Sequence, residues 1–480
     1  MTNLTTSLPE PFLVQMHELL GDELDAFLAS YGEPSRRGLR LNLLKNYGSH
    51  LIGTVADTLT TVPWCKEGYQ YPPEARPAKS FLYNAGLFYI QEPSAMSPAA
   101  ILRPQPRDRV LDICAAPGGK SVQLAGYMQG DGVLVSNDIS PSRCRALVKN
   151  LEMAGVTNSI VLTEKPNRLA DRFPGYFDCI LVDAPCSGEG MFRRDPDAAK
   201  AYTANKPESC AVLQQEILRH AATMLAPGGR MVYSTCTFNP LENELAIATF
   251  LAAHHDFKLL PIDHERLGLS QGRGEWADAQ SGVSGACLAS GCNLSYTARI
   301  WPHTAPGEGH FIALMIKTGE NALNFRDLHS GFSAGTQVRL PDEFSAFCEE
   351  TLNGFPFQNS NHTICRHGNS LFLQPESIDL SGLRVARSGW LLGECTKGRF
   401  VPSQALAMGI TQNQARYAID LPQPEASRYL RGESTMPPED FTPLPGKPWV
   451  LICCYGLPLG WARLVQGRLK NHLPTSWVIS

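Results

Sequence analysis

The chain has 480 residues, 43% of them hydrophobic and 18% charged, which indicates several packed domains and excludes a wholly disordered protein. Its formal net charge of −4 gives no overall basic character, so any contact with nucleic acid has to come from local groups of Lys and Arg. The N-terminus has no secretory signal pattern, and no segment holds about eighteen uninterrupted apolar residues, which predicts a cytoplasmic protein without membrane contact.

The first 90 residues predict a small α+β domain. Apolar residues recur at helical spacing from about Leu8 to Ala29, and Leu39, Leu41 and Leu43 then alternate with polar residues as in a strand. A proline-rich passage, VPWCKEGYQYPPEARP, interrupts this domain, and we place its boundary near residue 90.

Residues 91–318 predict a doubly wound α/β domain. Short apolar runs such as RVLDIC, GVLVSND, FDCILVDAP and GGRMVYSTC alternate with helical stretches such as SRCRALVKNLEMAG and QQEILRHAATML. This alternation is typical of a parallel sheet covered by helices on both faces. Two later runs, ARIWPHTAP and GHFIALMIK, predict a hairpin that closes one edge of the sheet, as in methyltransferases rather than dehydrogenases.

After residue 318 the strand pattern becomes weaker and turns are frequent. We expect a linker and a first C-terminal module over residues 319–390, and a second β-rich module over residues 391–480. No internal repeat or low-complexity segment is present.

The 14 cysteines are spread over the whole chain. Without an export signal we expect them to be reduced thiols. Cys287 and Cys292 are too far apart for a CxxC pair, and Cys453 and Cys454 are adjacent, so we expect no metal site.

The strand RVLDIC leads into a turn of small residues, and a helix follows near Ser121. Small residues let the backbone approach a ligand, and the free N–H groups at a helix start bind a carboxylate or phosphate. Asp138 ends the next strand, about where an acid binds ribose hydroxyls. These features predict an adenosine-containing cofactor. The absence of GxGxxG makes a nicotinamide cofactor the weaker alternative.

Asp183, Cys186 and Cys236 lie at or just after the carboxyl ends of two predicted strands. Doubly wound sheets bind their ligands at that edge, so we expect all three residues to lie beside the cofactor. A thiol is suited to attack an electron-poor ring carbon. Free cysteine is more often a small buried hydrophobe, but the position of these two among Pro, Gly, Ser and Thr favours chemistry.

The residues after Cys236 predict a capped helix. Asn239 is a good N-cap, Pro240 suits the first helical position, and Glu242 has a spacing like that of a capping box. The dipole of this helix is expected to favour the Cys236 thiolate.

Three motifs, CAAPGGK, DAPCSGEGMFRRDP and YSTCTFNPLENE, resemble signatures of the NOP/Sun RNA cytosine-5 methyltransferases. RLNLLK and YIQEPSAM resemble motifs that precede the catalytic part of that family, and the resemblance covers about residues 36–318. GEGHF near His310 and the C-terminal stretch GLPLGWARLVQGRLKNHLP are similar to the branch that acts on bacterial 16S ribosomal RNA. The resemblance implies a class I S-adenosylmethionine-dependent methyltransferase fold, Rossmann-like, with an N-terminal α+β domain and a PUA-like RNA-binding module at the C-terminus.

The resemblance also implies roles for individual residues. Cys236 attacks C6 of the target cytosine, Asp183 contacts the N3 and amino edge of the ring, and Cys186 helps to break the covalent bond to the RNA. S-adenosylmethionine is held through its ribose by Asp138, with Asp183 close by, and through its methionine part by the loop residues Cys114, Ala115, Ala116, Pro117, Gly118, Gly119 and Lys120. Lys120 is also a candidate for orienting the site, and a lysine on the helix surface without such a role is an equally good interpretation.

One position departs from the family pattern. Relatives usually have an aspartate near the end of the third strand that contacts the adenine, whereas TEKPNRL has Pro166 there. Asn167 or Glu164 are candidate substitutes, and adenine binding by backbone groups and apolar packing is a third possibility.

Several cations are candidates for contact with RNA phosphates, although solvated surface charge explains them equally well. They are Arg193 and Arg194 beside Cys186, an N-terminal group of Arg36, Arg37, Arg40 and Lys45, and a C-terminal group of Arg463, Arg468 and Lys470 after Trp461. His303 and His310 are expected to support the terminal hairpin.

The sequence thus favours a monomeric methyltransferase that acts on RNA of the small ribosomal subunit. Transfer RNA as the substrate, a nicotinamide-dependent oxidoreductase and a noncatalytic ribosome-assembly factor are the alternatives.

Overall fold

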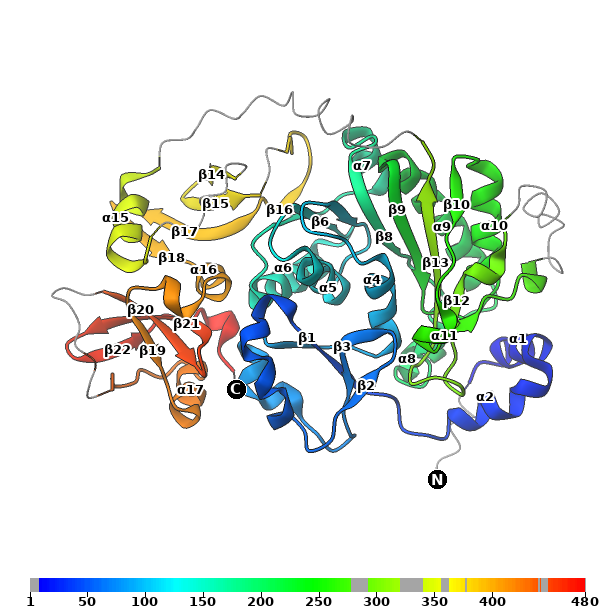
Figure 1. Ribbon diagram of the computed structural model, residues 1–480, viewed down its shortest axis with the longest axis horizontal. Coiled ribbons are helices and arrows are strands. Elements are labelled where there is room, and N and C mark those ends of the chain that lie inside the picture. The colour runs from blue at the N-terminus through cyan, green and yellow to red at the C-terminus, as the bar shows by residue number, and fades with distance from the viewer. Residues whose placement is uncertain are drawn as a thin grey trace.

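The computed structural model describes residues 8–277, 292–319, 340–354, 362–375, 378–438, 441 and 448–479. At its centre is a mixed sheet with the strand order β11-β12-β13-β9-β8-β5-β6-β7-β16 (Figure 1). Neighbouring strands from β9 to β7 run parallel: β5 (Arg109–Asp112), β6 (Val133–Asn137), β7 (Ser159–Leu162), β8 (Phe177–Asp183) and β9 (Leu225–Thr235). The order reverses direction between β5 and β8, which is the doubly wound topology expected from the sequence.

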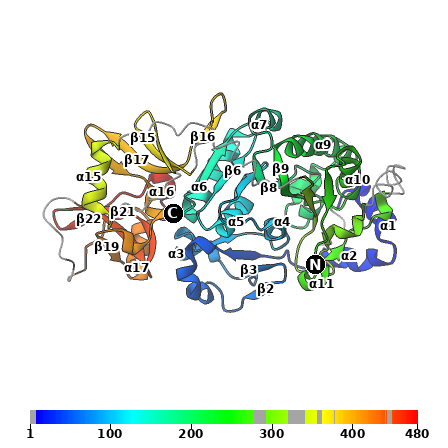
Figure 2. The ribbon, with the colours of Figure 1, turned by 45° about the horizontal axis from the view of Figure 1, so that its top comes forward.

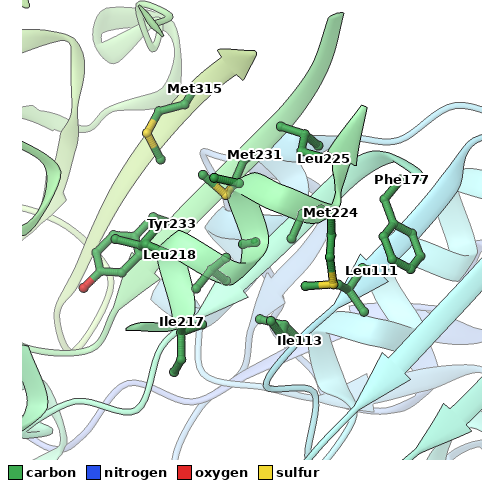
Figure 3. Close-up of a cluster of buried hydrophobic side chains, with 14 of the residues drawn as sticks. Leu111, Ile113, Phe177, Ile217, Leu218, Met224, Leu225, Met231, Tyr233 and Met315 are labelled. Carbon is green, nitrogen blue, oxygen red and sulfur yellow. The ribbon is translucent and has the colours of Figure 1, made fainter. Parts of the chain in front are cut away.

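Helices cover both faces of this sheet. One face packs against α7 (Pro166–Arg172), α9 (Lys206–Met224) and α10 (Glu244–Ala253), and the other against α4 (Ser97–Leu102), α5 (Gly119–Met128) and α6 (Pro141–Ala154). Figure 3 shows the first of these layers, where Leu218 of α9 lies among side chains of the sheet such as Leu111 and Met231. Because side chains on both faces are buried, the parallel strands are continuously apolar rather than alternating.

The predicted hairpin is confirmed. β12 (Ala298–Ile300) pairs antiparallel with β13 (His310–Lys317), and β13 pairs antiparallel with β9. The elements β10 (Phe257–Leu259), α11 (His264–Leu267) and β11 (Ser270–Gln271) complete this side. Since β13 runs against the parallel strands, its first residue, His310, lies at the edge where those strands end.

The N-terminal region combines helices and a separate sheet, as expected. α1 (Glu10–Leu20) and α2 (Leu24–Ser30) pack on an aromatic cluster that includes Phe192, Phe238 and Trp301 of the central domain. The antiparallel sheet has the order β2-β3-β1-β4, with β1 (Gly38–Leu41), β2 (Thr60–Val62), β3 (Cys65–Gln70) and β4 (Phe88–Ile90). The short helix α3 (Phe81–Asn84) packs in the same core as this sheet, and α8 (Pro196–Lys200) packs in the aromatic cluster.

Two further four-stranded sheets form the C-terminal part. The first contains β14 (Thr363–His367), β15 (Ser370–Gln374), β17 (Trp390–Thr396) and β18 (Arg399–Pro402), with α15 (Asp342–Thr351) and α16 (Gln404–Gly409). The second contains β19 (Ala418–Asp420), β20 (Trp449–Cys454), β21 (Leu457–Val465) and β22 (Arg468–Asn471), with α17 (Gln423–Leu430). The expected boundary at residue 390 falls at the start of β17, so the first sheet extends beyond it.

The C-terminal part of the chain contacts both the central domain and the N-terminal sheet. β16 (Val385–Arg387) pairs antiparallel with β7 and covers that edge of the central sheet. Figures 1 and 2 show the last module beside the N-terminal sheet, and the two share one apolar core in which Leu39 and Phe81 pack with Val450 and Leu457.

Twelve cysteines of the described residues are free thiols, as expected, but Cys292 is disulfide-bonded, contrary to that expectation. The expectation rested on the missing export signal. Such a signal indicates the compartment of a protein, but it does not indicate which cysteine side chains lie close enough to form a bond. Within the described ranges, no helix is both long and apolar enough to cross a membrane.

Candidate active site

A cavity of about 360 Å³ lies at the carboxyl edge of the parallel strands, next to the point where the strand order reverses between β5 and β8. This is the usual ligand position in doubly wound sheets. The residues that line it include Asp112, Asp183, Cys236 and His310, and from the glycine-rich loop Cys114, Ala115, Ala116, Pro117, Gly119 and Lys120. The cavity therefore brings together most of the residues singled out in the sequence.

The glycine-rich loop connects β5 to the start of α5. Gly118 has φ +112°, and a Cβ there would lie 3.0 Å from Leu147. Side chains of α6 hold the loop from behind: Arg143 Nη2 donates to the Ala116 carbonyl at 2.6 Å, and Asn150 Nδ2 donates to the Pro117 carbonyl at 2.8 Å. The loop is thus a fixed backbone surface beside the cavity.

Asp112 ends β5 and was not singled out in the sequence. It is fully buried; Oδ2 accepts from Ser121 Oγ at 2.6 Å, whereas Oδ1 has no hydrogen-bond partner. Burial raises the pKa of Asp112 to about 7. An acceptor oxygen left free at a cavity wall suits a ligand group that donates a hydrogen bond.

Asp138 follows β6, and its Oδ2 lies 3.3 Å from Arg143 Nη1 while its Oδ1 accepts from the Ser140 backbone. It is not among the residues that line the cavity. Asp112 and Asp138 stand at the carboxyl ends of two adjacent strands, β5 and β6.

Asp183 ends β8 in a polar setting. Oδ2 accepts from Lys120 Nζ at 2.7 Å, and Oδ1 accepts from Ser234 Oγ at 2.8 Å. Burial acts to raise the pKa of Asp183, but the charge of Lys120 and the contact with His310 outweigh it and hold the pKa well below its usual range. Asp183 is therefore a carboxylate. Lys120, which the sequence left ambiguous, is one of its direct partners.

The two cysteines meet at the cavity wall. Cys186 Sγ lies 3.3 Å from Cys236 Sγ. The hydrogen bond between the thiols, together with burial, raises the pKa of Cys186 well above its usual value. Their two loops are tied by a 2.6 Å contact between Ser187 Oγ and Thr237 Oγ1. Of the two residues, Cys236 lines the cavity.

The capped helix predicted after Cys236 is wrong. Helix α10 begins at Glu244, and the Asn239 side chain accepts from the Leu241 backbone in a local turn. Glu242 points inward instead, and its Oε2 accepts from the Ser187 backbone and from Gln214 Nε2, both at 2.9 Å. The helix thus begins eight residues after Cys236 rather than directly behind it.

His310 was expected to support the terminal hairpin and is the first residue of β13, but its place in the cavity was not expected from the sequence. It is 4% exposed and lines the cavity, with Nε2 3.9 Å from Asp183 Oδ1. Residue 311 pairs with Thr235, which places His310 beside the end of β9. Only the antiparallel course of β13 shows that the residue reaches this edge.

Three expected RNA-contacting cations are buried, which corrects the sequence-based expectation. Arg40 lies below the glycine-rich loop, where its Nη2 donates to the Gly119 carbonyl at 2.8 Å. Lys45 Nζ donates to the Ala85 carbonyl at 2.5 Å, and burial lowers its pKa to about 7. Arg193 forms a buried ion pair with Glu308, 2.6 Å apart. Charge alone did not reveal this burial.

Arg194, Arg37, Arg468 and Lys470 are exposed. Arg194 also lines the cavity. Arg36 is partly exposed and pairs with Glu33 at 2.8 Å.

The position of the missing aspartate is occupied by the start of a helix. Pro166 is the first residue of α7, and Asn167 is exposed. Glu164 is engaged elsewhere, since its Oε1 accepts from the Arg384 backbone at 2.7 Å. None of these three residues lines the cavity.

The central domain is a doubly wound sheet closed at one edge by an antiparallel hairpin. A loop of small residues follows its first parallel strand, and an acidic residue stands at the end of each of the first two. These features together define the class I S-adenosylmethionine-dependent methyltransferases. Residues 99–316 match the family model described as 16S rRNA methyltransferase RsmB/F. The chain belongs to the RsmF family of 16S rRNA methyltransferases: residues 8–93 match the N-terminal domain of RsmF, residues 346–410 its first C-terminal domain and residues 416–479 its PUA domain.

Curated relatives cover the whole chain. The protein named ribosomal RNA small subunit methyltransferase F from Klebsiella pneumoniae (strain 342) is 32% identical over 100% of this chain and 98% of its own length. The protein of the same name from Erwinia tasmaniensis is 31% identical over 98% of this chain and 96% of its own length. The nicotinamide alternative is set aside by this family membership.

Solved structures agree on the fold. A methyltransferase homolog from Pyrococcus horikoshii is 29% identical, covers 64% of this chain and 100% of its own, and has a TM-score of 0.51. NSun6 from Pyrococcus horikoshii, solved with the S-adenosylmethionine analogue SFG, has a TM-score of 0.53 at 20% identity and covers 65% of this chain and 99% of its own.

Proposed function

We propose that this protein transfers a methyl group from S-adenosylmethionine to C5 of a cytosine in RNA, and that the RNA is 16S ribosomal RNA of the small subunit. The observation that carries the proposal is the pair of thiols 3.3 Å apart at a cavity that also holds Asp183 and the glycine-rich loop. The names of the curated relatives support the substrate, and the matched PUA domain supports RNA binding.

The two thiols are unequal, which supports different roles. Cys236 lines the cavity and is the nucleophile that forms a bond to C6 of the cytosine. Cys186 has a raised pKa, so it stays protonated and does not compete as a nucleophile. After methyl transfer the C5–H bond breaks, its electron pair re-forms the C5–C6 double bond, and the Sγ–C6 pair returns to Cys236. From 3.3 Å the Cys186 thiol gives its proton to the departing Cys236 sulfur and takes up the C5 proton in exchange.

The remaining residues bind and orient. S-adenosylmethionine supplies an electrophilic methyl group when it is bound. Asp112 and the loop from Cys114 to Lys120 are placed to hold its methionine part, and Asp138 its ribose. The Asp183 carboxylate, fixed by Lys120, accepts a hydrogen bond from the amino group of the target ring.

The substrate has to present an unstacked base. C6 of a stacked cytosine is hidden, so the target lies in a loop or is flipped into the cavity. We include in the proposal that the protein acts as a monomer in the cytoplasm.

The test is methyl transfer from labelled S-adenosylmethionine to isolated small subunits, naked 16S rRNA and transfer RNA, followed by digestion to nucleosides. We expect label in 5-methylcytidine from the small-subunit RNA. Label found only in transfer RNA would overturn the substrate, and label in any other nucleoside would overturn the chemistry.

A further inference from the structure

His310 has a buried nitrogen without a partner at the wall of the cavity. Its Nδ1 is placed to donate to the Gly309 carbonyl, 3.0 Å away, and lies 3.4 Å from Ser94 Oγ. Its Nε2 has no hydrogen-bond partner and faces Asp183 Oδ1 at 3.9 Å. Leaving a buried polar atom unpaired destabilises the folded protein, so this atom indicates a ligand group in the cavity.

The reaction needs an acid at this place. When a thiolate adds to C6, the electron pair of the C5–C6 double bond shifts through the ring toward N3, which has to take up a proton. Asp183 has no proton to give, because its pKa is held well below the usual range.

Lys120 is a poor donor for a different reason. Burial acts to lower its pKa, but Asp183 outweighs this and raises it, so the ammonium keeps its proton near neutral pH. Its Nζ is also already bonded to Asp183 at 2.7 Å. Histidine is the side chain that exchanges a proton most readily in this pH range.

We propose that His310 is a catalytic acid that protonates N3 of the cytosine while Cys236 adds to C6. This role rests on the proposed function. In the step, the Cys236 Sγ–C6 bond forms, the ring pair moves to N3, the Nε2–H bond breaks and the N3–H bond forms. The reverse step breaks the Sγ–C6 bond, returns that pair to sulfur and gives the N3 proton back to Nε2.

The charged and titratable groups that share the cavity with His310 come from every element around it: Asp183 of β8, Lys120 of α5, Asp112 of β5, Tyr89 of β4, Glu92 before α4, Arg194 after β8, and the thiols of Cys114 and Cys236. Among them, the Asp183 carboxylate faces Nε2 at 3.9 Å. An acid acts in its protonated form, so the rate attributable to a histidine acid is expected to fall at alkaline pH.

The test measures addition without the methyl donor. Addition of Cys236 to C6 labilises the hydrogen at C5, so release of tritium from RNA labelled at cytosine C5 reports it in the absence of S-adenosylmethionine. We expect His310→Gln to slow both tritium release and methyl transfer by about 10²-fold or more, and to remove the alkaline decline of the wild-type pH profile. His303→Gln, a buried histidine of the same region that pairs with Glu23 outside the cavity, is the control and should keep that decline.

A second variant separates chemistry from folding. His310→Ala should bind S-adenosylmethionine as the wild type does, and added imidazole should restore part of its tritium release. A His310→Gln profile that matches the wild type, or an alanine variant that imidazole does not rescue, overturns the proposal. Failure of the proposed function looks different, because the wild-type protein would then release no tritium and form no 5-methylcytidine.

Discussion

Glu242 shows how a residue outside the cavity controls the pair of thiols. Its carboxylate holds the backbone of Ser187, next to Cys186, and a negative charge on it disfavours the Cys186 thiolate. Burial raises the pKa of Glu242 to about 7, and its Oε1 has no hydrogen-bond partner. The residue that was expected to cap a helix is thus an internal support of the catalytic loops.

The raised pKa makes Glu242 a source of pH-dependent stability. The folded protein binds its proton more tightly than the unfolded chain, so Glu242 favours folding below about pH 4, and this contribution is lost as the pH rises through about 7. Glu242→Gln stays neutral at every pH. Its melting temperature should therefore rise relative to the wild type between about pH 5 and about pH 8, by an amount equivalent to at most about 3 kcal/mol.

Thermal unfolding followed at both pH values checks this expectation. Glu208→Gln, an exposed acid on α9, should track the wild type throughout. Parallel curves for Glu242→Gln and the wild type would show that Glu242 is not protonated in the folded protein.

Some site residues could be predicted from the sequence and others could not. Asp183 and the two cysteines follow strands whose direction is clear from the pattern, so topology alone places them at one edge. His310 begins an antiparallel strand, and Asp112 ends a strand inside an apolar run, so neither position is visible without the fold. Burial of Arg40 likewise depends on packing between distant segments.

At the scale of elements, the segment after β8 is held in place by buried charge. Arg193 Nε donates to Glu308 Oε2 at 2.6 Å, and the two side chains are 3% and 2% exposed. Arg193 Nη1 also donates to the Ser30 carbonyl at 2.7 Å. This pair joins the loop of Cys186 to the segment that precedes His310 and to the end of α2, so it fixes two walls of the cavity relative to each other.

Neighbouring arginines should therefore behave differently. Arg193→Met leaves the Glu308 carboxylate buried without its partner and should destabilise the protein by about 3–5 kcal/mol. Arg194→Ala, at an exposed position of the cavity wall, should change stability by less than about 0.5 kcal/mol and raise KM for RNA.

Thermal unfolding and steady-state kinetics of both variants test this difference. If Arg194→Ala were unstable and Arg193→Met were stable but weak in RNA binding, Arg193 would contact RNA as the sequence suggested.

At the scale of the whole molecule, the terminal modules form a continuous body with the central domain. The last module packs on the N-terminal sheet, and Tyr455 stacks on Phe81 with ring centroids 5.7 Å apart. The helical and strand periodicity of the sequence predicted each module. The core that the two modules share joins segments more than 300 residues apart, so the local sequence pattern could not predict it.

The last module also carries exposed cations. Arg468 and Lys470 alternate with buried Leu469 on β22, so both face solvent on one side of the strand. Changing both to Ala should weaken binding of 16S rRNA and reduce the salt dependence of the affinity by about 1.4 to 1.8 in slope, since each lost phosphate contact accounts for about 0.7 to 0.9. Lys258→Ala, an exposed cation on β10 at the far side of the molecule, is the control and should leave both quantities unchanged (Figure 1).

Binding measured over a range of salt concentrations decides the point. An unchanged slope for the double variant would show that this face does not meet RNA phosphates.

The central claim is that Cys236 forms the covalent bond and Cys186 helps to break it. The most direct measurement is a denaturing gel of the wild type, Cys186→Ala and Cys236→Ala after incubation with substrate RNA and S-adenosylmethionine. The account predicts a covalent protein–RNA complex that accumulates in Cys186→Ala, and neither a complex nor methylation in Cys236→Ala. A complex that persists without Cys236 and disappears without Cys186 would contradict it.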